Sequence, residues 1–211
     1  LRLGVSLNRC LTGCLGIDFQ FSRGIDIASR SQGDVGKGTP LSRSSGKNNF
    51  SHFNLDTTYA VALDKNLEFN INTGGQLSLD DLLNSEQSSI TGPDKLSGFT
   101  SGSISGDESW YFRGQLNYKK KLSNKLTLTP YVYGATGVSY TLTPTATENR
   151  ATAARSIGLG LKMDGIDNYF FDKNISAKVE YSKNWATGVL EDVSDVRLNK
   201  QHLLVNLAMN F

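Results

Sequence analysis

Apolar and polar residues alternate along most of this 211-residue chain. In the stretch 110–122, Trp110 and Leu116 fall on one side of the alternation, whereas Arg113 and Asn117 fall on the other. Successive side chains of a β-strand point to opposite faces, so a period of two predicts a strand with one apolar and one polar face. Helical spacing is confined to the short stretch 78–87, and the sequence therefore predicts an all-β protein.

The alternation recurs in about nine segments, several of which contain ten residues or more. Strands of globular proteins most often have about 5–6 residues, whereas a tilted strand needs about 9–11 residues to cross a bilayer. The segment lengths therefore favour transmembrane strands. The predicted strands are 1–7, 15–22, 53–63, 67–77, 110–122, 125–142, 153–163, 174–184 and 200–211.

The predicted connections alternate between short and long. Short turns are predicted at 11–13, 64–66 and 123–125, and a turn of intermediate length at 164–173. Short turns at one end of a sheet and long loops at the other are typical of an outer-membrane β-barrel. The long connections are predicted at 26–51, 80–109, 143–152 and 186–199.

These patterns predict an antiparallel transmembrane β-barrel in the bacterial outer membrane. The apolar rows would contact outer-membrane lipid, and the polar rows would line a water-filled lumen. Inside a bilayer such a sheet has to close, because every backbone group needs a partner. A soluble β-sandwich also contains alternating strands and stays open as the alternative.

The last predicted strand carries a second signal. Its apolar row ends on a carboxy-terminal aromatic residue, which resembles the signal that the bacterial barrel-assembly machinery reads on outer-membrane barrels. The assembly machinery is therefore an expected partner. The residues of this row are Leu203, Val205, Leu207, Met209 and Phe211.

Composition and charge exclude several other functions. Charged residues make up 20% of the chain and the net charge is +2, with both signs interspersed, so the sequence gives no case for nucleic-acid binding. No G-x-S-x-G, phosphate-binding or dinucleotide motif is present, and the two histidines lack companion ligands. We therefore expect no enzymatic activity, no catalytic residues, no cofactor and no metal site.

The two cysteines, Cys10 and Cys14, flank the short turn 11–13. On opposite arms of a tight hairpin their side chains would lie within bridging range, and the cell envelope is an oxidising compartment. A disulfide is one reading. A pair of free thiols, or a pair outside any regular hairpin, is the other.

The stretch "NSEQSSITGPDKLSGFTSGSISGDESWYFRGQL" at 84–116 resembles the signature of two-partner secretion transporters, also called hemolysin secretion/activation proteins. That signature reads SSEQFSIGGP-x-x-V-R-G-F and then GD-x-G-W-Y-x-R-x-E-L. "PYVYGATGV" and "ARSIGLGLK" resemble the strands that follow, so the similarity covers most of residues 40–211. The matching positions include Glu86, Gln87, Gly92, Pro93, Gly98, Phe99, Gly106 and Asp107 in the loop, with Arg113, Tyr133 and Gly137 on its strand partners.

The resemblance implies that residues 1–211 form a translocator segment, the C-terminal half of a sixteen-strand barrel, without the N-terminal strands and the periplasmic domains. The long loop 80–109 would be the sixth extracellular loop, which plugs the lumen. The implied function is a pore that secretes a partner exoprotein of hemolysin or adhesin type in unfolded form. The alternatives are a small self-closed barrel with a structural or adhesive role and a barrel-assembly insertase of the same superfamily.

Two positions depart from the family pattern. Ser97 stands where the family loop has Arg, and Ala135 stands where the family strand has an inward Asp that pairs with this Arg. Losing both charges together leaves no unpaired charge in the lumen. We therefore expect the loop to fold into the lumen without its ion pair, held instead by hydrogen bonds from Ser97 to Thr136 or Tyr133.

Overall fold

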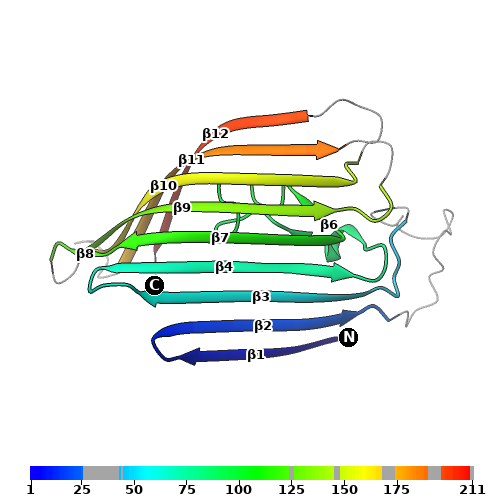
Figure 1. Cartoon of the computed structure of the whole chain (residues 1–211), viewed down its shortest axis with the longest axis horizontal. Coiled ribbons are helices and arrows are strands. Elements are labelled where there is room, and N and C mark those ends of the chain that lie inside the picture. Colours follow the sequence, from blue (N-terminus) through cyan, green and yellow to red (C-terminus); the bar gives the residue numbers. More distant parts are fainter. Residues whose placement is uncertain are drawn as a thin grey trace.

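The structure is a computed structural model that describes residues 1–25, 43, 45–123, 126–144, 148–167, 174–189 and 196–209. Its main element is one antiparallel sheet, in which the long strands lie side by side in the order of the sequence (Figure 1). The all-β, antiparallel fold is thus confirmed. The strands are β1 (Arg2–Cys10), β2 (Gly13–Arg23), β3 (Ser51–Ala62), β4 (Leu67–Ser78), β7 (Glu108–Tyr118), β8 (Lys120–Lys121), β9 (Thr127–Tyr140), β10 (Ala151–Asp167), β11 (Asn174–Val189) and β12 (Val196–Met209).

Most strand limits differ from the predicted ones by a few residues. For example, β10 runs from Ala151 to Asp167, so the turn expected at 164–173 is shorter. The strand expected at 110–122 is broken after Tyr118, and β8 pairs separately with β9. The connection expected at 186–199 is shorter, because β11 continues to Val189 and β12 begins at Val196. The connections β2–β3, β4–β7 and β9–β10 leave one end of the sheet, which we call the loop end, and the turns β1–β2 and β3–β4 lie at the opposite turn end.

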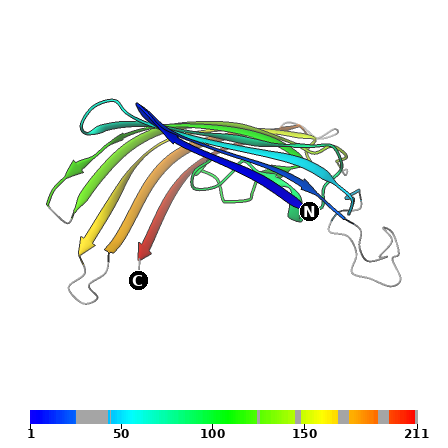
Figure 2. The same cartoon turned by 90° about the horizontal axis from the view of Figure 1, so that it is seen from below.

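The sheet is strongly curved, and a smaller set of elements lies under its concave face (Figure 2). These elements belong to the connection between β4 and β7. They are the 3₁₀ turn η1 (Asn84–Glu86) and the short strands β5 (Ser88–Ser89) and β6 (Ser105–Gly106), which pair with each other. In the described residues the strand order runs from β1 to β12 without pairing these two outer strands.

Burial on the sheet is the reverse of that in a soluble domain. On the concave face, polar side chains such as Gln76, Arg113 and Asn184 are buried. On the convex face, large apolar side chains are exposed, with Leu159 at 60% and Leu203 at 64%. No second sheet covers these apolar rows within the described residues, so the sandwich alternative does not fit. No helix in this part of the chain is long and apolar enough to span a bilayer.

Candidate functional site

The connection between β4 and β7 forms a loop that packs against the concave face; we call residues 79–107 the inner loop (Figure 2). Two of its apolar side chains, Ile90 and Leu96, are fully buried. They join a cluster with aromatic and small side chains of the sheet, and Phe99 and Ile104 pack at its edge. Burial of this apolar surface fixes the loop on the sheet. The sheet members of the cluster are Tyr111, Tyr131, Tyr133, Ala135, Ala154 and Ala186.

The tip of the inner loop is held by polar contacts. Ser97 donates its hydroxyl proton to Glu180 Oε1 on β11, and it accepts a hydrogen bond of 2.6 Å from Arg113 Nη1 on β7. Arg113 also donates to the backbone oxygen of Lys95 at 3.1 Å. Asn184 Nδ2 donates to the backbone oxygen of Gly98 at 2.7 Å. The tip therefore bridges β7 and β11, which are not neighbours in the sheet.

Glu180 is the centre of a small set of charged and polar groups, which we call the charge cluster: Arg113, Glu180, Lys178, Tyr131 and Ser97. Arg113 Nη2 lies 3.5 Å and Lys178 Nζ lies 3.1 Å from Glu180 Oε2, and both Arg113 and Glu180 side chains are at most 3% exposed. The Tyr131 hydroxyl donates to the same carboxylate oxygen at 2.6 Å. A buried carboxylate is tolerable only with such partners.

The predicted hydrogen bonds from Ser97 to Thr136 or Tyr133 are wrong, because both hydroxyls have other partners. The Thr136 hydroxyl donates to the backbone of Ala154, and the Tyr133 hydroxyl bonds Ser156 at 3.0 Å. Arg113 is the cross-strand neighbour of Ala135, where no carboxylate is available. Its guanidinium stacks over the Tyr133 ring, 3.7 Å from the centroid, and turns toward Glu180. The ion pair at this point joins two strands, and the loop contributes only the Ser97 hydroxyl, which bonds both Arg113 and Glu180.

Asp107 organises the base of the inner loop. It is completely buried, and both of its carboxylate oxygens lie 2.8 Å from Arg43 Nη1. Its carboxylate also accepts hydrogen bonds from the backbone of Leu82 and Leu142 and from the Gln87 side chain. A Cβ at the preceding Gly106 would lie 2.4 Å from a backbone oxygen of β9, so this position needs glycine.

The comparisons with known proteins agree with this geometry. The profile of the family described as haemolysin secretion/activation protein ShlB/FhaC/HecB matches residues 1–163. The chain belongs to this family. Its members are outer-membrane β-barrel transporters of bacteria and not enzymes, so the predicted family and location are confirmed.

A solved structure shows the same fold. The chain is similar to CdiB from Escherichia coli with a TM-score of 0.69 and 17% sequence identity. The similarity covers 99% of this chain and 36% of the CdiB chain, so the chain spans about a third of that relative's length. No curated protein sequence matches significantly.

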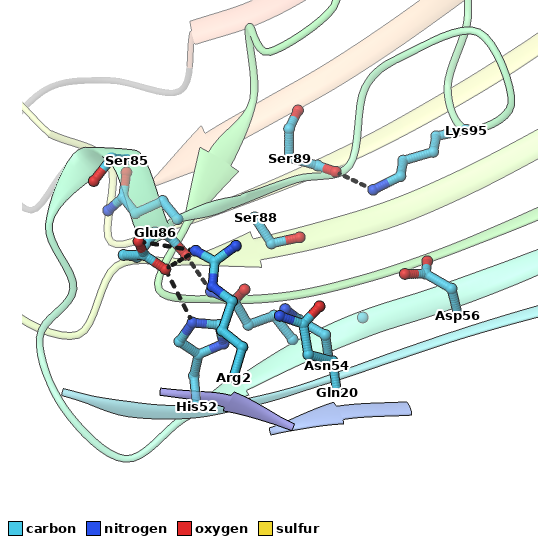
Figure 3. A pocket seen from close by; sticks show the side chains of 13 residues that line it. Arg2, Gln20, His52, Asn54, Asp56, Ser85, Glu86, Ser88, Ser89 and Lys95 are labelled. Atoms are coloured by element: carbon cyan, nitrogen blue, oxygen red, sulfur yellow. Dashed lines mark hydrogen bonds and ion pairs between the residues drawn. The ribbon is translucent and has the colours of Figure 1, made fainter. Parts of the chain in front are cut away.

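Several residues of the loop stretch that resembles the family signature have a structural role. Both carboxylate oxygens of Glu86 accept hydrogen bonds from Arg2 Nη2. Glu86 also lies 3.4 Å from His52 Nε2, beside a polar cavity of about 320 Å³ (Figure 3). Gly92 has a φ of 154°, which favours glycine, and Pro93 follows it in the turn. A Cβ at Gly98 would lie 1.9 Å from Asn184 Oδ1.

The remaining candidate residues lie on strands of the main sheet or in its hairpins. Gly137 lets the Ile90 side chain approach β9 closely. Cys10 and Cys14 form a disulfide across the β1–β2 hairpin. Leu203, Val205 and Leu207 are exposed on the convex face of β12, whereas the Met209 side chain and Phe211 lie outside the described residues.

Several residues of the site were not predicted. Glu180 was recognisable as an inward charge of its strand, but nothing in the sequence paired it with the loop. Asn184 gave no signal, and neither did Arg43 in a long polar connection. The part of the chain that the structure describes contains no group of three or more His, Cys, Asp or Glu side chains suited to a metal ion.

Proposed function

We propose that residues 1–211 are a translocator segment of an outer-membrane pore that secretes a partner exoprotein of hemolysin or adhesin type in unfolded form. The segment supplies wall strands from the C-terminal half of a sixteen-strand barrel, together with the loop that plugs its lumen. One observation carries the proposal: the inner loop is seated on a polar concave face while the convex face exposes apolar rows. An eight-strand barrel is filled by side chains, whereas about sixteen strands leave an aqueous channel.

Export requires the inner loop to leave at least part of the concave face. The polar contacts at its tip are hydrogen bonds, which water or a passing polypeptide can replace. The base is held more firmly, because Asp107 is fully buried and has several donors. The geometry therefore favours a loop whose middle part, from Ile90 to Ile104, lifts from the concave face while the base at Asp107 stays in place.

A disulfide between the loop and the sheet tests this proposal. A Cβ at Gly137 would lie 3.3 Å from the Ile90 Cβ, close to the separation of about 3.5–4.5 Å in disulfides. Ile90→Cys/Gly137→Cys is made in the full-length protein with Cys10→Ser/Cys14→Ser to prevent mispairing. We expect oxidised protein to lose exoprotein secretion and large single-channel openings, and reductant to restore both.

The single variant Gly137→Cys is the control, since it changes the sheet without linking the loop. Unchanged secretion in the oxidised double variant would contradict the moving loop. A full-length protein with no channel openings and no exoprotein secretion in any state would instead favour a small closed barrel or a barrel-assembly insertase.

A further inference from the structure

We infer that the convex face of β10 and β11 binds the phosphate groups of an anionic lipid in the outer leaflet, through Arg155 and Lys183. Both side chains are exposed and project from the same face as the apolar rows. The inference uses the membrane location of the family and not the proposed export function.

The convex face of this part of the sheet is almost free of charge. We consider the described positions of β9, of β10 as far as Met163, and of β11. On this face they include two charged residues, Arg155 and Lys183, and no Asp or Glu. Neither side chain forms an ion pair or hydrogen bond with another described residue. Two cations on a lipid-facing wall thus lack a counter-ion from this part of the protein.

The two cations lie near the loop end, above the apolar rows. Arg155 is directly opposite Trp185, and Lys183 is directly opposite Ile157. On the side toward the turn end, the same face exposes Leu159 and Tyr181. In outer-membrane barrels the long loops are extracellular, so this border corresponds to the outer interface.

Two local features support a binding site at this border. Lys183 Nζ lies 5.4 Å from the centroid of the Trp185 ring, so the ammonium group is directed toward the loop end and away from the apolar rows. An open depression of about 560 Å³ lies beside it, lined by Ala153, Arg155, Trp185 and Thr187. A basic side chain, an indole ring and a hydroxyl therefore surround one hollow.

Phosphate on a lipid is the occupant that fits this chemistry. A guanidinium group forms two parallel hydrogen bonds to phosphate oxygens, and an ammonium group adds a point charge. The apolar rows directly below would contact acyl chains of the same molecule. A free phosphate ion would use the two cations but not the apolar wall, so the surface fits a phosphorylated lipid better.

The test compares binding of bisphosphorylated and dephosphorylated lipid A by full-length protein in nanodiscs of neutral lipid. We expect wild-type protein to prefer the phosphorylated form. In Arg155→Gln/Lys183→Gln this binding weakens about thirtyfold, because each basic side chain near an anionic surface contributes about fivefold. The matched control Lys65→Gln/Lys162→Gln removes the same charge near the turn end and should bind like wild type.

Three results would overturn the inference. They are equal binding of both lipid forms, an unaffected Arg155→Gln/Lys183→Gln variant, and displacement of the lipid by millimolar inorganic phosphate, which would indicate a free-phosphate site. If the Gln variant fails to fold, the charge-preserving Arg155→Lys/Lys183→Arg should retain most of the binding, and its loss would also reject the site. Exoprotein secretion is measured in parallel and is not expected to change.

Discussion

At the scale of single residues, Arg113 and Glu180 depend on each other because both are almost completely shielded from solvent. Removing one member of a buried ion pair leaves an uncompensated charge, which costs about 3–5 kcal/mol. We predict that Glu180→Ala lowers the free energy of unfolding by about this amount, and that Arg113→Gln/Glu180→Gln loses less than the sum of its single variants. A double-mutant cycle on full-length protein folded into vesicles measures the coupling.

The control is the ion pair between Lys119 and Glu68, in which the two side chains are 51% and 26% exposed. An exposed pair contributes only about 0–1 kcal/mol, so Glu68→Gln should have a small effect. Additive losses for Arg113 and Glu180, or equal losses for the exposed and buried pairs, would show that the charge cluster does not stabilise the site.

The two departures from the family pattern lead to a second residue-level prediction. Ser97→Arg alone brings a second guanidinium toward Arg113, and Ala135→Asp alone introduces a carboxylate into an apolar cluster beside it. Together they supply the opposite charges that the resemblance to the family implies. We predict that each single variant loosens the inner loop and that the double variant is more stable than their sum, by about 0.5–3 kcal/mol. Protection of the loop from protease measures this. If the losses of the two single variants simply add in the double variant, the two positions do not interact.

At the scale of elements, the inner loop approaches β11 so closely that Gly98 at its tip has no room for a side chain. A Cβ at Gly98 would overlap Asn184, whereas a Cβ at Gly134 on the convex face would meet no atom within 4 Å. Overpacking typically costs about 1–3 kcal/mol. We predict that Gly98→Ala displaces the tip, raises channel conductance and exposes the loop to protease, while Gly134→Ala changes neither. Equal behaviour of the two variants would show that the tip is not held on β11.

The strands were predictable from the sequence because a period of two is a local property, and it assigned Arg113 and Glu180 to the polar face correctly. Their contact was not predictable. In the register, Arg113 is level with Asn184, whereas Glu180 is level with Asn117, four residues nearer the turn end. The curvature of the sheet and the long Arg113 side chain, which runs past Gln115, close this gap. Both depend on three-dimensional geometry that alternation does not encode.

At the scale of the whole molecule, the sheet separates two environments. Its concave face buries charged and polar groups under the inner loop, and its convex face exposes apolar rows from β1 to β12. In water this arrangement would leave a large apolar surface in contact with solvent, at about 25 cal/mol for each square ångström. In a bilayer the same surface contacts acyl chains instead of water, so the membrane contributes to the stability of the curved sheet.

This separation predicts opposite responses for neighbouring residues of one strand. Val205 is 66% exposed on the convex face of β12, and Asn206 lies next to it on the concave side. Lysine on the lipid-facing side of a barrel costs about 2–4 kcal/mol near the bilayer midplane, whereas lysine in a hydrated lumen has little cost. We predict that Val205→Lys lowers the free energy of unfolding in vesicles by this amount and that Asn206→Lys changes it by less than about 0.5 kcal/mol. Denaturant titration of full-length protein gives both values. The two variants add the same charge one residue apart, so equal losses would mean that lipid does not contact the convex face.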